Sequence, residues 1–316
     1  MPFSNAAKTI KMASMGDHMK ILAMLAAPLL LAANPAHAAA PAETSAQADA
    51  WCVAHLQPLL AGTADAKNPH TQFCQAIMSH SRDHDDAAAA VHMRKAAEAG
   101  YAPAQAMLGG FYETGRGVAR NPSEGLKWIK AAAEQGLPNA QYAYAGLLMT
   151  GIGTPADPQA AIPWLRKSSD AGYAEGQSAL ATAYREGRGV TRDEEAAVRL
   201  YRLAAAQDHP YATFALGAMT FNGQGTAEDK PAGLVLVDKA ARRGVAEAQL
   251  ALAAVYVTGV GAPRDDVAAL TWYEAAADGQ GSRDPAADAV ERRLTPAQVA
   301  KARSDAKAII AQTKTK

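Results

Sequence analysis

The sequence repeats itself with a period of 36 residues. Five consecutive blocks, the first starting at Tyr101, stay in register through residues 101–280, and the fifteenth and seventeenth places of every block are glycine. A period of this length is typical of solenoids, in which each repeat is one supersecondary unit that can bury its apolar face only against its neighbours. The period therefore predicts a row of similar stacked units.

Each block reads as two helices, A and B, joined by the Gly-x-Gly turn. Before the glycines, alanine and larger apolar residues recur at helical spacing, as at Ala104, Leu108 and Tyr112. The first glycine can take the left-handed conformation that ends a helix, and the second allows a tight reversal. Four residues later each block has an Asn or Asp, residue types that accept hydrogen bonds from the free N–H groups at a helix start. In the first block, Asn121 and Glu124 predict a reciprocal cap.

The same turn also resembles a phosphate-binding loop, because Gly115-Arg116-Gly117 comes shortly before a helix start. Such a loop occurs once and usually follows a strand, whereas this one follows a helix and recurs five times. The capping side chain also takes the N–H groups that an anion would need. We therefore interpret it as a turn between helices, and we expect no cofactor.

Helix B of each block has a large residue as its anchor, followed one turn later by small residues. The five anchors are Trp128, Trp164, Leu200, Leu236 and Trp272. Large side chains beside small ones allow neighbouring helices to approach closely. The predicted fold is all-α: an α-solenoid, or superhelix, of stacked antiparallel helix pairs.

The repeated pattern resembles the Sel1-like repeat, a relative of the tetratricopeptide repeat. The first block matches the family pattern best, with Ala104-Gln105, Leu108-Gly109, Gly115, Gly117 and Trp128, and the fourth departs most, with Thr213 in place of the glutamine. The resemblance implies a TPR-like solenoid. It also implies a non-enzymatic scaffold or adaptor, since Sel1-like proteins mostly act in this way with varied partners.

The ends of the chain are predicted to differ from the repeats. Residues 51–100 read as a divergent N-terminal helical cap or repeat, and 281–316 as C-terminal capping helices and a tail. Terminal units of a solenoid need a polar outer face.

The first 38 residues match a cleavable signal peptide. Lys20 is followed by an apolar run and by the small-residue site Ala36-His37-Ala38, and the interpretation that we favour starts translation at Met19. Residues 39–50 read as a flexible linker. The apolar run is too short to span a bilayer comfortably, so we expect a periplasmic chain with no membrane span after cleavage. Equal counts of 31 basic and 31 acidic residues argue against a nucleic-acid partner.

If the chain is exported, its two cysteines are expected to form a disulfide. Cys52 and Cys74 are the only cysteines, and an oxidising compartment favours a disulfide between them. The alternatives are two buried thiols or a catalytic thiol, and the latter lacks a Cys-x-x-Cys or Cys/His pattern.

The predicted binding site is a surface on the A helices. If places 4, 7, 8, 11 and 12 of helix A face the core, places 3, 6, 10 and 13 form an adjoining stripe, which in related solenoids lines the concave groove. We call this the A-helix stripe. Its candidate residues for binding a protein or peptide are Tyr142, Met149, Glu175, Arg185, Tyr211, Phe214, Phe221, Leu250 and Val257. The alternative for Phe214 and Phe221 is packing between adjacent helices.

Two other functions remain as alternatives. One is a weak β-lactamase or penicillin-binding hydrolase, because Ser304-x-x-Lys307 has the spacing of such enzymes, although the Ser-Asp-Asn and Lys-Thr-Gly elements are missing. The other is metal binding by His80 and His84, which would share one face if they lay on a helix. The more plausible interpretation of both motifs is a solvated surface.

Overall fold

The computed structural model describes Cys52 and residues 64–81, 83–280 and 283–314. Over these residues the chain forms helices and turns, and no strand is present in them. The predicted all-α fold is confirmed. The predicted signal peptide, the linker and most of residues 51–63 lie outside the described part.

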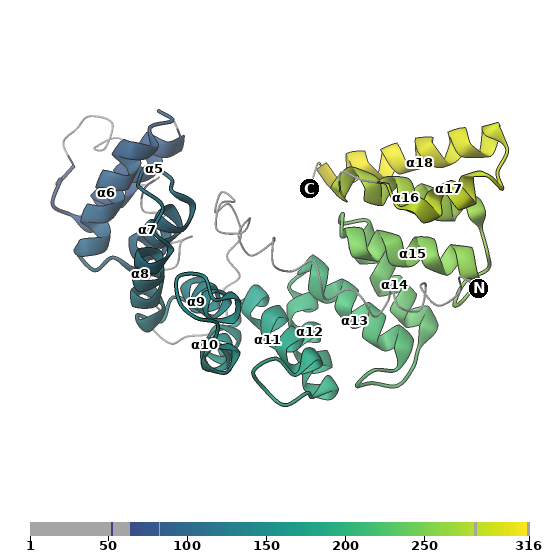
Figure 1. The fold of residues 1–316 in the computed structure, drawn as a ribbon, viewed down its shortest axis with the longest axis horizontal. Coiled ribbons are helices and arrows are strands. Elements are labelled where there is room, and N and C mark those ends of the chain that lie inside the picture. The colour runs from purple at the N-terminus through teal and green to yellow at the C-terminus, as the bar shows by residue number, and fades with distance from the viewer. Residues whose placement is uncertain (1–51, 53–63, 82, 281–282, 315–316) are drawn as a thin grey trace. The chain divides into compact units, whose positions relative to one another are not determined.

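The helices follow the predicted two-helix blocks (Figure 1). The A helices are α5 Pro69–Ser81, α7 Ala102–Thr114, α9 Pro138–Thr150, α11 Ala174–Glu186, α13 Pro210–Asn222 and α15 Ala246–Thr258. The B helices are α6 Asp86–Glu98, α8 Pro122–Glu134, α10 Pro158–Asp170, α12 Glu194–Ala206, α14 Lys230–Ala241 and α16 Asp266–Gln280. Two further helices follow them, α17 Pro285–Glu291 and α18 Pro296–Lys314. Helix pair α5–α6 precedes the five predicted blocks.

The contacts divide the described residues into two compact units. The N-terminal unit contains 64–183 and 187–191, and the C-terminal unit contains 184–186 and 192–314. The division falls at the end of α11. In each unit successive helices pack on one another, for example α7 on both α6 and α8, and α14 on both α13 and α15.

In the five predicted blocks each B helix starts at the predicted cap. The side chains of Asn121, Asp157, Asp193 and Asp229 accept from the N–H group three residues later, and Asp265 does the same for Ala268. The reciprocal cap predicted for Glu124 is wrong. The N–H group of Asn121 donates to the Tyr112 carbonyl at 2.7 Å instead, and the Glu124 carboxylate pairs with Lys127.

Two glycine pairs bring helices of one block into close contact. A Cβ atom added to Gly109 of α7 would lie 2.8 Å from the Gly125 carbonyl oxygen of α8, and one added to Gly217 of α13 would lie 2.9 Å from the Gly233 carbonyl oxygen of α14. Real Cβ atoms essentially never come this close. The missing side chains therefore set the spacing of these helix pairs.

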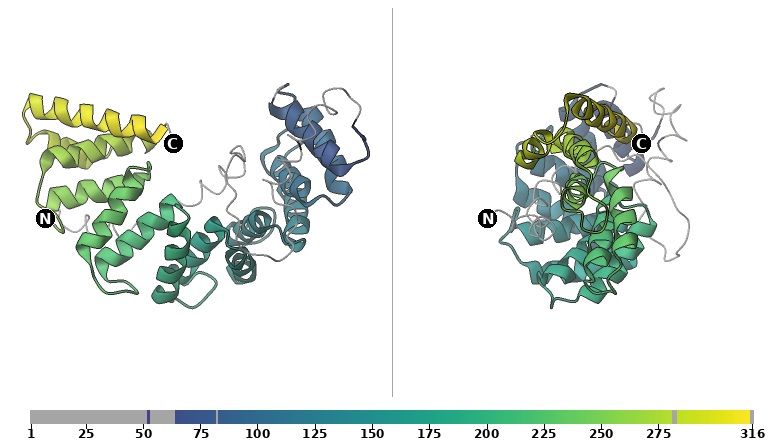
Figure 2. Two further views of the ribbon diagram at one scale, coloured as in Figure 1. Left: turned by 180° about the vertical axis from the view of Figure 1, so that it is seen from behind. Right: turned by 90° about the vertical axis from the view of Figure 1, so that its right-hand side faces the viewer.

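Each unit has its own apolar core. In the N-terminal unit Phe73, Met93 and Leu108 are buried together, which joins the N-terminal pair α5–α6 to the first block. In the C-terminal unit one cluster runs from Phe214 to Ala306 and includes residues of α18. Figure 2 shows α18 lying along α16 at the end of this unit. None of the helices in the described residues has the length and hydropathy required to cross a bilayer.

Candidate functional site

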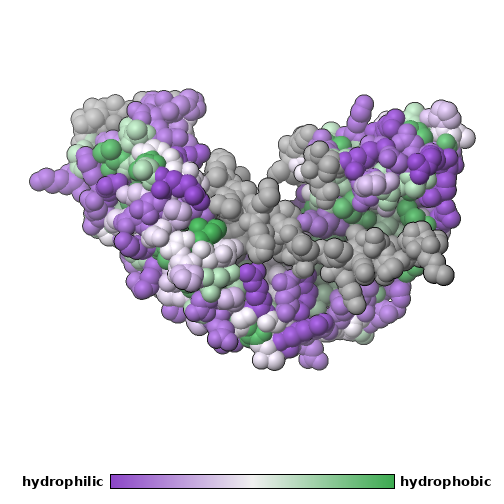
Figure 3. Space-filling model, viewed as in Figure 1, coloured by the Kyte–Doolittle hydropathy of each residue, from purple (hydrophilic) through white to green (hydrophobic). Residues whose placement is uncertain are grey.

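The residues of the A-helix stripe differ in exposure. Tyr142 on α9, Glu175 and Arg185 on α11, Tyr211 on α13, and Leu250 and Val257 on α15 are half-buried. Met149, Phe214 and Phe221 are buried. In the space-filling view hydrophilic residues predominate and hydrophobic ones show in small separate groups (Figure 3).

In the N-terminal unit Tyr173, a residue that the prediction did not include, interacts with both Tyr142 and Glu175. The ring of Tyr173 lies 5.9 Å from that of Tyr142, centroid to centroid. Burial and the neighbouring Glu175, which is hydrogen-bonded to Tyr173, raise the pKa of this tyrosine well above its usual range. Tyr173 therefore stays neutral and fixes the Glu175 carboxylate beside an aromatic pair.

In the C-terminal unit Arg185 lies between two tyrosines. Its Nη2 donates to Tyr211 Oη at 3.3 Å and to Glu186 Oε1 at 2.9 Å, and its Cζ lies 5.8 Å from the ring centroid of the fully buried Tyr201. Tyr211 in turn meets Phe214 edge to face at 6.2 Å. The four side chains Arg185, Tyr201, Tyr211 and Phe214 form what we call the Arg185 cluster.

Phe221, at the thirteenth place of the fourth block, faces helix B of its own block. A Cβ atom on Gly233 of α14 would lie 2.7 Å from the Phe221 Cβ, and one on Gly261 would lie 2.6 Å from the Phe221 ring. Phe214 belongs to the core cluster of the C-terminal unit. The packing alternative thus describes how these two phenylalanines are placed, while their role as partner contacts stays a prediction.

The second glycine of each turn contacts the preceding block, which the sequence did not predict. A Cβ atom on Gly117, Gly153, Gly189 or Gly225 would lie between 1.9 and 2.4 Å from the carbonyl oxygen of the first residue of the preceding B helix. These are Asp86, Pro122, Pro158 and Glu194. The turn is filled by protein backbone, and its role is to join blocks.

A glutamine also joins neighbouring blocks. Gln105, Gln141 and Gln249 are buried, and each donates from Nε2 to the carbonyl oxygen eight residues earlier, at 3.0 to 3.3 Å. Gln177 makes the same contact at 3.4 Å. In the fourth block Thr213 takes this place, and its hydroxyl donates to the His209 carbonyl within its own helix start. The junction before the fourth block therefore lacks this side-chain link.

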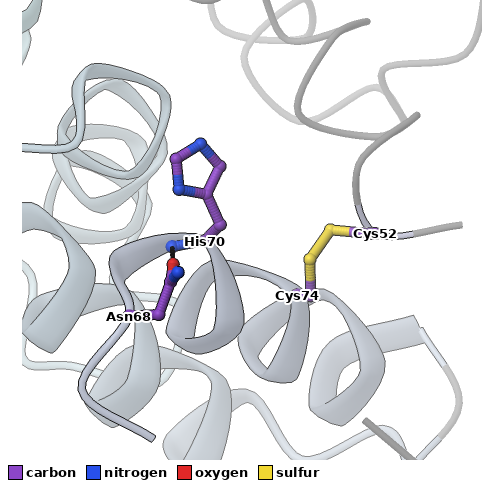
Figure 4. Close-up of a disulfide and its surroundings, with 4 residues drawn as sticks. All are labelled: Cys52, Asn68, His70 and Cys74. Carbon is purple, nitrogen blue, oxygen red and sulfur yellow. Dashed lines mark hydrogen bonds between the residues drawn. A yellow bond between two sulfur atoms is a disulfide. The ribbon is translucent and has the colours of Figure 1, made fainter. Parts of the chain in front are cut away.

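The predicted disulfide is present. Cys52 is bonded to Cys74 of α5, with the Cα atoms 5.4 Å apart (Figure 4). Near it, the N–H group of His70 donates to Asn68 Oδ1 at the start of the same helix. The Cys74 side chain is buried in the core of the N-terminal unit.

The two histidines do not share a helix face. Helix α5 ends at Ser81, and His84 lies beyond it with a φ of 53°. His80 Nδ1 contacts Asp86 Oδ1, and Arg116 lies 3.4 Å from His80 Nε2. In the described part of the chain, no three His, Cys, Asp or Glu residues gather as a metal would need.

The motif Ser304-x-x-Lys307 lies on α18, where both side chains are exposed. Neighbouring Lys301 and Asp305 form an i,i+4 ion pair on this helix. The motif thus lies on a solvated helix surface.

Glu113 is a buried acidic residue that sequence reasoning missed. It occupies the thirteenth place of the first block, is 2% exposed, and neither carboxylate oxygen has a hydrogen-bond partner in the described residues. Burial raises its pKa, and the charge of Arg120 opposes this shift. The Arg120 Nε donates to the backbone carbonyl of Glu113 rather than to the carboxylate. The only sequence signal is a charged residue where other blocks have Met149, Phe221 or Val257.

These features define an α-solenoid of helix pairs, a fold typical of scaffolds for protein–protein interaction. The Sel1 repeat family model matches residues 80–101, 102–137, 138–173, 174–209, 210–245 and 246–280. The five matches from residue 102 onward each begin one residue after the start of a predicted block. The shorter match, residues 80–101, covers part of the pair α5–α6. The chain belongs to the Sel1 repeat family.

Solved structures agree with this fold. A Sel1 repeat protein from Oxalobacter formigenes is 29% identical, with a TM-score of 0.65 over 74% of this chain and 98% of its own. The protein c5321, a protective antigen of uropathogenic Escherichia coli with an SLR fold, is 23% identical, with a TM-score of 0.53 over 86% of this chain and 69% of its own. No curated protein sequence matches the chain significantly.

Proposed function

We propose that the chain is a non-enzymatic periplasmic scaffold or adaptor that binds a protein or peptide partner along its A-helix stripe. Through this partner it acts on an envelope or signalling complex. The Sel1 repeat fold supports the general class, because stacked helix pairs present a long row of side chains to a partner.

The observation that carries the proposal is the set of half-buried apolar and aromatic residues on the A helices. Tyr142, Tyr211, Leu250 and Val257 keep part of their surface in solvent, and the last three pack against the core cluster of the C-terminal unit. Aromatic residues and arginine on such surfaces provide much of the binding energy of protein interfaces. Charged groups lie close by and can orient a partner: Arg185 is hydrogen-bonded to Tyr211, and Glu175 neighbours Tyr173, whose ring contacts Tyr142.

Two observations support export. The Cys52–Cys74 disulfide is a bond that persists in an oxidising compartment. The sequence before it has the charged, apolar and small-residue regions of a signal peptide.

The test is photo-crosslinking in intact cells that express the full chain. A photoreactive phenylalanine analogue replaces Tyr142 or Tyr211, which exchanges one aromatic side chain for another. The matched control places the analogue at Val235 of α14, which is 69% exposed on a B helix. We expect both stripe positions to capture the same periplasmic protein, identified by mass spectrometry, and the control position not to.

Capture of the same protein from Val235 with equal yield would show that the stripe is not the binding surface. A chain retained in the cytoplasm, with its two cysteines reduced, would contradict the proposed location.

The chain is not expected to react with β-lactams. A fluorescent penicillin should not label the purified chain, and nitrocefin should not be hydrolysed, because Ser304 and Lys307 are exposed on a helix surface. Covalent label recovered on Ser304 would support the hydrolase alternative.

A further inference from the structure

Arg185 is the one positively charged residue among the predicted contacts of the A-helix stripe. It occupies the thirteenth place of its block, and its side chain keeps 19% of its surface exposed. The other blocks have Glu113, Met149, Phe221 and Val257 at this place. The third block therefore places a cation where three of the other four have an apolar side chain.

The guanidinium of Arg185 is held in position, but its hydrogen-bonding capacity is only partly used. Both of its hydrogen bonds, to Tyr211 and Glu186, leave from Nη2. Within the described residues its Nε and Nη1 have no partner. A guanidinium carries five N–H donors in a rigid fork, so three donors remain on a group that the protein already orients. Binding through them costs little additional side-chain entropy.

Partly exposed apolar residues lie on the two A helices that follow this cation. Tyr211, Ala218 and Leu250 are partly buried against the core cluster of the C-terminal unit, on α13 and α15. The Tyr211 hydroxyl accepts from the guanidinium, and the Tyr211 ring meets Phe214 edge to face. A partner that contacts Arg185 can therefore bury an apolar side chain against Tyr211 at the same time.

We propose that the Arg185 cluster binds an acidic side chain of the partner, an aspartate or glutamate that lies next to an aromatic or aliphatic residue. The carboxylate accepts from the free donors of Arg185, and the neighbouring apolar side chain packs on Tyr211. This inference rests on the proposed function and specifies the partner's chemistry. Charge complementarity favours it: Glu186, the one carboxylate that contacts Arg185 within the described residues, uses only Nη2, which leaves the rest of the fork for a second carboxylate.

The test begins with a peptide library displayed at the N-terminus of a phage coat protein, selected on the immobilised full chain. Peptides displayed in this way have no free C-terminal carboxylate, so any selected acid is a side chain. We expect the selected sequences to place Asp or Glu within two residues of an aromatic or aliphatic residue.

A double-mutant cycle then measures the contact itself. One selected peptide is synthesised with a C-terminal amide, together with a variant in which its acid is replaced by the matching amide, Asp→Asn or Glu→Gln. Both are titrated against the wild type and against Arg185→Met, which copies the residue of the second block. We expect a loss of about tenfold in affinity from either change alone, and no further loss from the second.

Three controls make the result decisive. Arg199→Met removes an exposed charge from a B helix and should leave affinity unchanged. Arg185→Lys keeps the charge but not the fork and should recover only part of the affinity. Circular dichroism and thermal unfolding check that each variant is folded.

Equal selection of acidic and non-acidic peptides, or losses that simply add, would overturn the inference. If the Arg185 contact is overturned in this way but Leu250→Ser still lowers the affinity for the peptide, the proposed binding face stands without that contact. If neither Leu250→Ser nor Arg185→Met weakens the peptide, both proposals fail.

Discussion

The contact between each Gly-x-Gly turn and the preceding block can be tested with two glycines that share a backbone conformation. Gly153 has a φ of 76°, and a Cβ atom there would lie 2.4 Å from the Pro122 carbonyl oxygen. Gly136 has a φ of 91°, and a Cβ atom there would meet nothing within 4 Å. Gly136→Ala therefore measures the cost of the left-handed backbone, and Gly153→Ala measures that cost together with the steric clash.

The expected magnitudes follow from these distances. A left-handed alanine costs about 1 kcal/mol, part of which is offset by the lower entropy of the unfolded chain. At Gly153 the two backbone segments must also move apart by roughly half an ångström, and overpacking of this kind costs about 2 kcal/mol more. We expect Gly136→Ala to destabilise by about 1 kcal/mol and Gly153→Ala by about 3 kcal/mol.

The assay is urea unfolding followed by circular dichroism and by tryptophan fluorescence. Stacked repeats can unfold in stages, so the midpoints are compared only where the dependence on urea is the same in both variants. The reasoning is refuted if the two substitutions lower the free energy of unfolding equally, because the turn would then end the helix without joining the blocks.

Three further predictions follow from buried and paired groups. Glu113→Gln should stabilise the chain more at pH 8 than at pH 4. Because folding raises the pKa of Glu113 above 4.5, the wild type loses stability as the pH rises from 4.5 through the pKa of Glu113 in the folded chain. Thermal midpoints across this range check the prediction, and a pH-independent effect would show that the carboxylate finds a partner. Gln249→Ala should cost about 1 to 2 kcal/mol in urea unfolding, because it removes the 3.0 Å bond to the Ala241 carbonyl; an unchanged midpoint would mean that the bond contributes nothing. Asp266→Asn should lower the free energy of unfolding at pH 7. It should also remove the loss of stability that the wild type suffers below pH 3.8, because the hydrogen bond from Arg293 lowers the pKa of Asp266 to about 2. Acid unfolding curves that coincide for both chains would contradict this pairing.

The local structure of the repeats could be predicted from the sequence because it depends on neighbouring residues. Glycine at a fixed place ends helix A, and the Asn or Asp four residues after the second glycine starts helix B, as at Gly151 and Asp157. Both effects arise within a few residues, and repetition makes them visible five times over. The reciprocal cap of Glu124 failed because the Asn121 N–H group already had a partner across the turn.

Contacts between blocks could not be predicted in the same way. The pattern shows that Gly153 and Gln141 recur, but not that one approaches Pro122 and the other the Ala133 carbonyl, since both contacts depend on how the blocks stack. For the same reason the sequence left two interpretations open for Phe221, a surface contact or packing between helices, and only the structure shows that it packs on helix B.

The binding role of the candidate site stays a prediction. The structure shows only which of its residues are neighbours: Tyr142 and Glu175 both lie next to Tyr173, and Arg185 is hydrogen-bonded to Tyr211. Tyr173 was missed because it opens its block, one residue before the helix begins.

The central claim is that a partner binds the A helices rather than the B helices. Hydrogen exchange, followed by mass spectrometry on the full chain with and without the partner captured from Tyr211, tests this directly. We predict slower exchange in α13 and α15, with α12 and α14 unchanged. Protection confined to the B helices, with free exchange retained in α13 and α15, would contradict the claim.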